Sequence, residues 1–109
     1  MFTRKLSFTP IKYPKARAMG ITAFPYKEFD SNGNQTYYEN EGGKFYRNEY
    51  DSNGNEIFFT NTDGYWYRKE YDSNSNTTYY EDSNGCWERY EYDSNGNQTH
   101  YENSDGYKN

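Results

Sequence analysis

One six-residue phrase recurs along most of this 109-residue chain. It occupies residues 50–55 and returns, with small changes, at residues 29–34, 71–76 and 92–97. The aspartates of the phrase are 21 residues apart, and so are four glycines further along the units. They are Asp30, Asp51, Asp72 and Asp93, and Gly43, Gly64, Gly85 and Gly106. A fixed period of this length indicates a repeat array in which each unit holds two turns and two short segments.

Both segments of a unit have the composition of β-strands. Residues 55–60 and 65–71 are rich in aromatic and β-branched side chains and poor in helix formers. Asn53-Gly54 favours a type I′ hairpin turn, in which both central residues have positive φ. Ser75 replaces the glycine in the third unit, so we expect this turn to be the weakest of its set. The sequence therefore predicts an all-β fold, an antiparallel meander of repeated β-hairpins.

The alternation of side chains along a strand fixes the expected register of the central hairpin. The expected pairs are Tyr50 with Ile57, Glu49 with Phe58, and Arg47 with Thr60. Aromatic residues then lie on both faces, which favours a single-layer or twisted sheet over a sandwich. Arginine and glutamate recur in phase at Arg47, Arg68 and Arg89 and at Glu49, Glu70 and Glu91. We expect ladders in which each guanidinium lies over an aromatic ring.

The N-terminal segment differs from the repeats in proline content and charge. It holds all three prolines, and residues 1–28 carry 6 basic side chains against 1 acidic. Residues 29–109 carry 6 basic against 16 acidic. We predict a basic segment over residues 1–25 and a four-unit repeat domain over residues 26–109, with an edge strand that begins near Ile21. The basic segment is either a flexible or loosely docked tail that balances the acidic body or a contact element for a partner or for nucleic acid.

No catalytic constellation stands out from the repeats. His100 is the only histidine and Cys86 the only cysteine, and they occupy unrelated phases of the repeat. A nucleophile–base pair, a disulfide and a thiolate metal cluster are therefore not expected. The periodic aspartates have a sufficient role as turn initiators. We predict a protein that is not an enzyme and that needs no cofactor.

Calcium binding is the alternative interpretation of the turn residues. Asp51-x-Asn53-x-Asn55 has the oxygen spacing of a calcium loop at its first three ligand positions. The glycine at position six and the distal bidentate glutamate are missing from their required places. Turn chemistry explains the same residues, so we expect no metal site.

The repeat resembles two known families. Tyr-Asp-x-x-Gly-Asn, followed by a second glycine ten residues on, resembles the YD repeat of RHS-type proteins over about three quarters of the chain. In that family many repeats coil a sheet into a shell around a cargo, and about four units are too few to close. The hairpins that contain Gly43-Lys44-Phe45-Tyr46 and Gly64-Tyr65-Trp66-Tyr67 resemble cell-wall or choline-binding repeats. The units at Gly85 and Gly106 break that second pattern.

The leading functional hypothesis is a non-catalytic protein that binds another protein through an acidic, tyrosine-rich sheet. Small acidic β-proteins of this kind resemble phage-encoded inhibitors of host defence, including anti-CRISPR proteins that occupy the nucleic-acid channel of a nuclease. The resemblance implies charge mimicry, in which carboxylates engage the Lys and Arg side chains that hold phosphates. The residues expected at the partner surface are Tyr46, Glu49, Trp66, Tyr67, Glu70, Trp87, Glu88 and Glu91.

Two other functions stay open at this point. One is a carbohydrate or cell-wall binding module with Phe45, Trp66 and Trp87 as ring platforms. The other is a structural piece of a larger repeat protein that associates, for example as a homodimer, through unpaired sheet edges. We expect no direct binding of nucleic acid by the acidic body and no membrane association. The expected location is the cytoplasm, that of the host if the protein is phage-encoded, with export by another route as the alternative.

Overall fold

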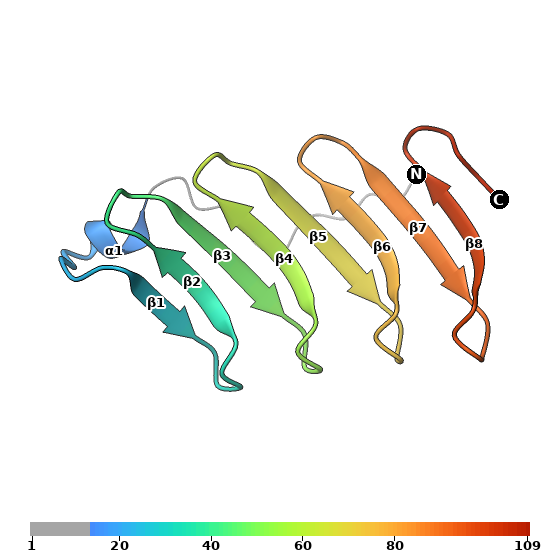
Figure 1. Ribbon diagram of the computed structural model, residues 1–109, viewed down its shortest axis with the longest axis horizontal. Helices are drawn as coiled ribbons and strands as arrows, with labels where there is room; N and C mark the ends of the chain where they lie inside the picture. The colour runs from blue at the N-terminus through green and yellow to red at the C-terminus, as the bar shows by residue number, and fades with distance from the viewer. Residues whose placement is uncertain (1–13) are drawn as a thin grey trace.

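The computed structural model describes residues 14–109. Within them, eight strands form one antiparallel sheet, and each strand pairs with its neighbours in the chain (Figure 1). A short helix, α1 (Lys15–Ala18), precedes the sheet. The strands are β1 (Tyr26–Phe29), β2 (Gln35–Glu39), β3 (Phe45–Tyr50), β4 (Glu56–Asn61), β5 (Trp66–Tyr71), β6 (Thr77–Asp82), β7 (Trp87–Tyr92) and β8 (Gln98–Asn103). The predicted all-β meander of hairpins is confirmed.

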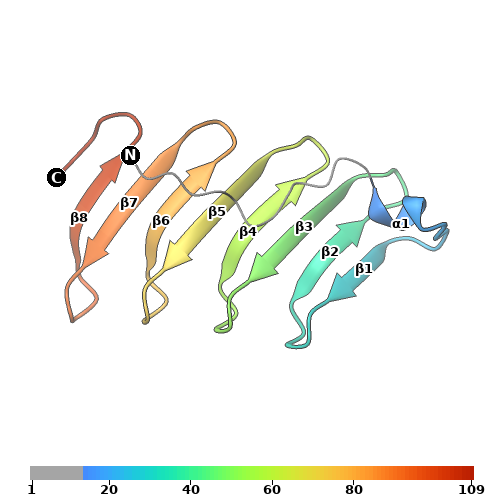
Figure 2. The same cartoon turned by 180° about the vertical axis from the view of Figure 1, so that it is seen from behind.

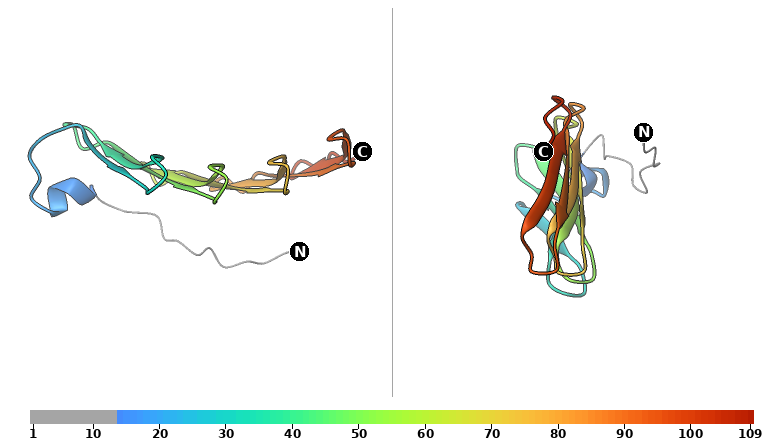
Figure 3. Two further views of the ribbon diagram at one scale, coloured as in Figure 1. Left: turned by 90° about the horizontal axis from the view of Figure 1, so that it is seen from below. Right: turned by 90° about the vertical axis from the view of Figure 1, so that its right-hand side faces the viewer.

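The sheet is a single open layer. Seen edge-on, it forms a gently curved ribbon, and α1 lies against one face at the end that holds β1 (Figure 3). Figure 2 is seen from behind the view of Figure 1 and shows the face that carries α1. β1 and β8 form the two ends, and the sheet does not close into a barrel. A layer of this kind leaves two broad faces on which side chains are displayed.

The hairpin turns are not the type I′ turns that the sequence predicts. Gly54 donates its N–H to the carbonyl of Asp51 at 3.0 Å and has a φ of 83°. Among residues 14–109, Ser75 is the only non-glycine residue with positive φ, so Asn53 does not have the conformation that a type I′ turn requires. The loop is a type I turn followed by a left-handed glycine. The Asp51 carboxylate favours this geometry because it accepts the N–H groups of Asn53 and Asn55, both at 2.9 Å.

The turns at the opposite ends of the strands have the same geometry. Asn61 accepts the N–H of Gly64 through its carbonyl and the N–H of Asp63 through its side chain. An aspartate or asparagine opens each of the eight turns between residues 30 and 107, and the fourth residue has positive φ. At Ser75 this φ is 65°, as the repeat predicts. Each 21-residue unit therefore contains the same loop twice.

The register of the central hairpin agrees with the prediction at two pairs and differs at the third. Glu49 lies opposite Phe58, and Arg47 lies opposite Thr60, as expected. Tyr50 lies opposite Glu56 instead of Ile57. The loop has three residues instead of two, and a β-bulge between Glu49 and Tyr50 absorbs the difference. The same shift recurs at the corresponding place in the other three units.

The cross-strand pairs place two sets of side chains on the two faces. The helix-bearing face holds Tyr37, Glu39, Phe45, Arg47, Glu49, Phe58, Trp66, Arg68, Glu70, Tyr79, Glu81, Trp87, Arg89, Glu91, His100 and Glu102. The tyrosine face holds Tyr38, Tyr46, Phe59, Tyr67, Tyr80, Tyr90 and Tyr101. The buried rings of Tyr37, Phe45 and Phe58 all belong to the helix-bearing face. The core therefore sits on that face, at the β1–β4 end.

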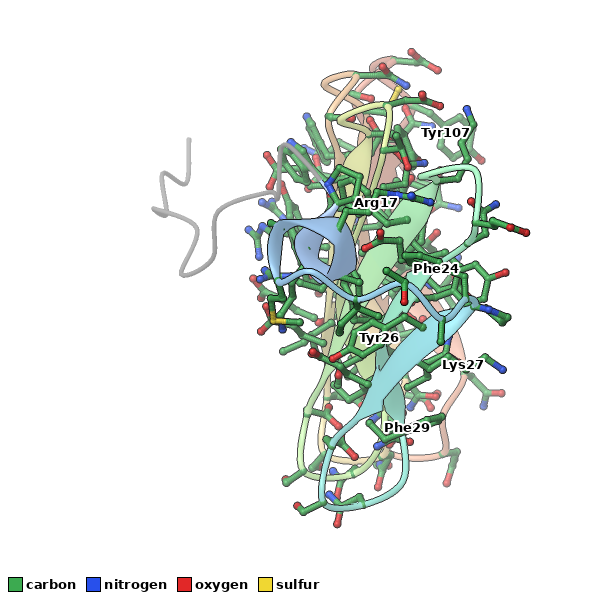
Figure 4. All side chains as sticks on the ribbon, turned by 90° about the vertical axis from the view of Figure 1, so that its left-hand side faces the viewer. Arg17, Phe24, Tyr26, Lys27, Phe29 and Tyr107 are labelled. Carbon is green, nitrogen blue, oxygen red and sulfur yellow. The ribbon has the colours of Figure 1, made fainter. Side chains whose placement is uncertain are left out.

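The chain before β1 differs from the prediction. The first strand begins at Tyr26 and not near Ile21, and residues 21–25 form the irregular connection from α1 around the β1 end of the sheet (Figure 3). Arg17 of α1 lies over the ring of Phe24, with the guanidinium carbon 4.4 Å from the ring centroid (Figure 4). Ala16 is fully buried against the sheet. Residues 1–13 of the predicted basic segment lie outside the described part of the chain.

Candidate functional site

An arginine–glutamate ladder runs along the helix-bearing face. Arg68 pairs with Glu70 at 2.9 Å and with Glu81 at 3.0 Å, and its guanidinium carbon lies 5.1 Å from the centroid of the Tyr79 ring. The related contacts are Arg47 with Glu49 at 2.8 Å and with Phe58 at 5.7 Å, and Arg89 with Trp87 at 5.7 Å. The predicted ladder of guanidinium groups over aromatic rings is confirmed. Burial raises the pKa of Glu49, and the charge of Arg47 opposes this rise.

The ladder changes its pairing near the C-terminal end of the sheet. Arg89 pairs with Glu102 at 3.1 Å, whereas Arg47 and Arg68 pair with the glutamate two residues later. Glu91 is exposed, and within residues 14–109 its carboxylate makes no ion pair. The side chain of Arg89 is 45% exposed and that of Arg68 only 6%. The β7–β8 hairpin is therefore the part of the ladder that is most open to a partner.

At the other end of the sheet, α1 supplies the cations. Lys15 Nζ lies 2.6 Å from Glu28 Oε1, and Arg17 Nε lies 3.3 Å from the buried Glu39 carboxylate. Backbone N–H groups of α1 also bind the sheet. Lys15 N donates to the Tyr37 hydroxyl and Ala16 N donates to Glu39, both at 2.8 Å. Residues 14–18 are thus docked on the sheet, which is one of the two states, flexible or loosely docked, that the sequence predicts for such a tail.

The pKa of Glu28 reflects this contact. Partial burial opposes ionisation of the carboxyl, but hydrogen bonds from Lys15 and Tyr26 and the charge of Lys15 outweigh it. The pKa of Glu28 is therefore held below its usual range. The carboxylate stays charged near neutral pH and attracts Lys15.

Stacked rings cover the tyrosine face. The ring centroids of Tyr38 and Tyr46 are 5.1 Å apart, as are those of Phe59 and Tyr67. The hydroxyl of Tyr67 donates to Glu56 at 2.5 Å, and burial together with this bond raises the pKa of Tyr67. The rings pack mostly against one another, so this face contributes to stability as well as to the exposed surface.

Glu88 interrupts the row of tyrosines. It occupies the repeat position of Tyr46 and Tyr67, and its two carboxylate oxygens accept the hydroxyls of Tyr90 at 2.8 Å and Tyr101 at 3.0 Å. Burial and the hydrogen bond to Glu88 raise the pKa of Tyr90. Both oxygens of Glu88 are thus engaged within the sheet, so the structure gives this predicted site residue a stabilising contact.

The eight predicted partner-binding residues do not share one surface. The helix-bearing face holds Glu49, Trp66, Glu70, Trp87 and Glu91, and the tyrosine face holds Tyr46, Tyr67 and Glu88. Phe45, a ring platform in the carbohydrate interpretation, is only 3% exposed. The exposed carboxylate of Glu91 and the half-buried Trp87 make the β7 part of the helix-bearing face the best candidate surface.

Two contacts of the repeat were not visible in the sequence pattern. The hydroxyls of Tyr50, Tyr71 and Tyr92 donate to backbone carbonyls 15 residues earlier, at 3.0, 2.7 and 2.7 Å. In the turns at the opposite ends of the strands, three hydroxyl residues exchange hydrogen bonds with residues 17 positions earlier. They are Thr62, Ser83 and Ser104. The recurrence of these residues at a period of 21 was the available signal. The hydrogen-bond acceptors and donors that these side chains reach are set by which hairpins lie next to each other in the sheet.

The residues with catalytic or metal-binding chemistry remain apart. His100 Nε2 lies 3.5 Å from Glu102, and Cys86 is exposed just after a turn. Within residues 14–109, no group of three His, Cys, Asp or Glu side chains could hold a metal ion. The Asp51 carboxylate, the first ligand of the calcium interpretation, accepts two backbone N–H groups and the Asn55 side chain. These contacts support the turn interpretation of the repeated aspartates.

The chain was compared with protein-family models and with curated proteins. No family model matches it, and no curated protein matches it. In the described part of the chain, no helix has the length and apolar character needed to cross a membrane.

Proposed function

We propose that this chain is a non-catalytic binding protein that engages another protein through the acidic part of its helix-bearing face. The observation that carries the proposal is the charge of β5–β8 on that face. Four glutamates, Glu70, Glu81, Glu91 and Glu102, face two arginines, Arg68 and Arg89. Among residues 14–109, the cations of α1 pair with glutamates only near β1, so in this part of the chain carboxylates outnumber arginines on the face of β5–β8.

The spacing of the carboxylates supports the form of inhibitor that the sequence suggests. Glu49, Glu70 and Glu91 belong to alternate strands, so they follow one another at about 10 Å across the sheet. A row of negative charges on a flat surface competes with phosphates for the Lys and Arg side chains of a nucleic-acid channel. We propose a phage-encoded inhibitor of a host defence nuclease as the protein of this kind. Half-buried rings such as Trp87 supply contact area between the charges.

Capture from a bacterial lysate tests this proposal. Immobilised chain is compared with the triple variant Glu49→Gln, Glu70→Gln and Glu91→Gln, and captured proteins are eluted with a DNA oligonucleotide. We expect a nucleic-acid-binding nuclease that the oligonucleotide releases and that the triple variant does not retain. Loss of charge on the face, with the backbone pairing unchanged, is the physical reason.

A matched control removes the same number of charges elsewhere. Glu41, Asp63 and Asp105 are exposed turn residues, and changing them to Gln or Asn lowers the negative charge equally. This control is expected to retain the partner. If the triple variant retains the partner as well as the wild type does, and the oligonucleotide releases nothing, charge mimicry is wrong.

A carbohydrate-binding module is the second proposed function. Trp66 and Trp87 lie on the same face, two strands apart, which is an arrangement that stacking on sugar rings can use. Retention on a polysaccharide column that is lost in Trp87→Ala supports this function. Free passage of the wild-type chain through such columns excludes it for the polysaccharides used.

A further inference from the structure

The tyrosine hydroxyls of the tyrosine face are bound within the sheet. The hydroxyl of Tyr67 donates to Glu56 at 2.5 Å, and that of Tyr80 donates to Asp82 at 2.9 Å. The hydroxyls of three further tyrosines bond to Gln35 or Glu88, and these are Tyr46, Tyr90 and Tyr101. Within residues 14–109, Tyr38 is the one tyrosine of this face whose hydroxyl makes no hydrogen bond. A second protein layer can therefore cover this face without leaving these polar groups unpaired.

The charged side chains of the tyrosine face nearly balance. The strands of residues 14–109 place two lysines and three carboxylates there, namely Lys27, Lys69, Glu56, Asp82 and Glu88. The carboxylates are the ones that accept the tyrosine hydroxyls. Lys69 Nζ lies 5.3 Å from the centroid of the Tyr67 ring. Two copies of this face therefore repel each other little, although the whole chain carries a net charge of -5.

A row of five rings crosses the middle of the tyrosine face. It runs from Tyr38 through Tyr46, Phe59 and Tyr67 to Tyr80, with neighbouring ring centroids 5.1 to 6.0 Å apart. Neighbouring rings are inclined by 17° to 31°, so they cover one another's faces and present their edges outward. A sugar ring stacks on an open aromatic face, whereas ring edges pack against the side chains of a protein layer. The row therefore favours a protein surface as the layer that covers this face.

The described part of the chain does not supply that layer. α1, the only helix in residues 14–109, lies against the opposite face of the sheet (Figure 3). Among these residues, the buried apolar side chains belong to α1, β2, β3 and β4, and none belongs to β5–β8. A sheet becomes stable when a second layer covers its apolar face. The half-buried tyrosines of β5–β8 are therefore the side chains that gain most from such a layer.

We propose that the second layer is another copy of this chain, so that two copies pack with their tyrosine faces together. A second copy presents the same strand spacing and the same row of rings, which lets the side chains of the two faces interdigitate. The sheet measures 51 Å by 29 Å. Crossed packing, one of the two ways in which sheets stack, confines the overlap to the shorter dimension and reduces the effect of the curvature (Figure 3). A square with a side of 29 Å has an area of about 800 Å², which is what each partner of a standard interface buries.

This dimer leaves the helix-bearing face of each copy on the outside. It does not depend on the proposed function, because the acidic surface belongs to the opposite face of the sheet. Two acidic surfaces then point away from each other, so that one dimer can engage two partner surfaces.

Sedimentation equilibrium of the full-length chain tests the inference. We expect a reversible dimer whose dissociation constant changes less than about threefold between about 0.1 M and about 1 M sodium chloride, because ring contacts and not charges hold it. Tyr67→Glu should raise the dissociation constant more than about tenfold, because each dimer then buries two added carboxylates in the rows of rings. The fold accepts glutamate at this position, since Glu88 occupies the equivalent place one unit later.

A matched control introduces the same charge on the other face. Trp87→Glu also replaces an aromatic ring by glutamate, but on the helix-bearing face, and should change the dissociation constant by less than about twofold. Far-ultraviolet circular dichroism shows whether both variants keep the sheet. If Tyr67→Glu does not fold, photo-oxidative coupling of tyrosines in a mixture of unlabelled and ¹⁵N-labelled wild-type chains decides the question. We expect dityrosine links between copies at Tyr67 and Tyr80, and none at Tyr79 of the helix-bearing face.

Three results would overturn the inference. The first is a wild-type chain that stays monomeric up to about 0.3 mM. The second is a folded Tyr67→Glu variant that dimerises as tightly as the wild type. The third is a set of links between copies that joins the helix-bearing faces instead of the tyrosine faces. None of these results decides the proposed function, because capture of a partner from the lysate is measured independently on the acidic face.

Discussion

The phenolic oxygen of Tyr71 lies 2.7 Å from the carbonyl oxygen of Glu56, which belongs to the preceding hairpin. Tyr50 and Tyr92 make the same bond to Gln35 and Thr77. The tyrosine that opens the recurrent phrase is therefore a link between successive units. Phe29 opens the first unit without a hydroxyl and is 58% exposed at the β1 end (Figure 4). In a single-layer sheet with a thin core, such links between neighbours supply the cooperativity of the array.

Removing one of these hydroxyls should destabilise the sheet. We expect Tyr71→Phe to lower the free energy of unfolding by about 1 kcal/mol, because it breaks a partly buried hydrogen bond and keeps the ring. Urea denaturation followed by far-ultraviolet circular dichroism measures the change. Tyr38→Phe is the control, because within residues 14–109 the hydroxyl of Tyr38 makes no hydrogen bond while its ring is stacked on Tyr46. Equal stability of the two variants would contradict the linking role.

Ser75 is the residue at which the repeat stores strain. Its φ is 65°, where the other units place glycine. Ser75→Gly should raise the free energy of unfolding by about 0.5 to 1 kcal/mol, because a Cβ at positive φ costs more than the added freedom of glycine in the unfolded chain. The hydrogen bond from Asn55 to the Ser75 hydroxyl is exposed and offsets little of this gain. The reverse change, Gly54→Ser, should destabilise by a similar amount, and stabilisation by Gly54→Ser would contradict the explanation.

Acid should weaken the turns that aspartate opens. Backbone N–H donors, partly opposed by desolvation, hold the pKa values of Asp30, Asp51, Asp72 and Asp93 below the usual 3.8. A lowered folded-state pKa adds stability that is fully present above the unfolded value and is lost as the pH falls through the folded value. Below about pH 4 the chain should therefore lose stability.

Asparagine variants isolate this effect. Asn103 shows that an asparagine oxygen accepts the same two backbone N–H groups, so Asp51→Asn with Asp72→Asn should keep the fold and flatten the loss of stability below about pH 4. Thermal unfolding between pH 7 and pH 2 measures this loss of stability in the wild type and in the double variant. Asp105→Asn is the control, because its carboxylate accepts no hydrogen bond from residues 14–109. An unchanged acid limb in the double variant would show that other groups dominate.

Arg68 and Arg89 should differ in their contribution to stability. Arg68 is nearly buried between two glutamates, whereas Arg89 is half-exposed with one. We expect Arg68→Met to lower the free energy of unfolding by about 2 kcal/mol, since it removes the ion pairs that a nearly buried guanidinium makes with two partly buried carboxylates. Arg89→Met should cost less than about 1 kcal/mol. Guanidinium chloride denaturation of both variants decides the matter, and equal losses would contradict the assigned difference in burial.

The repeat period predicts the larger part of the fold. The strands, the meander order, the pairs Glu49–Phe58 and Arg47–Thr60 and the two aromatic faces all follow from alternation and turn chemistry. The turn type does not follow, because the Asp51 carboxylate binds the loop N–H groups and selects a type I turn. The resulting three-residue loop also explains why Tyr50 lies opposite Glu56.

Contacts between residues that are far apart in the chain could not be predicted from the sequence. A four-residue helix such as α1 has almost no local stability, and its position depends on Glu28 and Glu39 of the sheet. The eight predicted partner-binding residues divide between the two faces of the sheet, as the alternation along the strands implies, and the sequence did not single out one of the faces. The 21-residue period identifies the recurring arginines and glutamates. It does not predict that Arg89 pairs with Glu102 and leaves Glu91 exposed.

The salt dependence of partner retention tests the central claim most directly. Screening acts over about 10 Å at 0.1 M salt and about 3 Å at 1 M, so charges on an exposed face lose most of their effect across this range. Retention of the lysate partner on the immobilised wild-type chain should fall steeply as salt rises, and the triple variant Glu49→Gln, Glu70→Gln and Glu91→Gln should bind little at any salt. Retention that is independent of salt and equal for both chains would contradict binding through the acidic face.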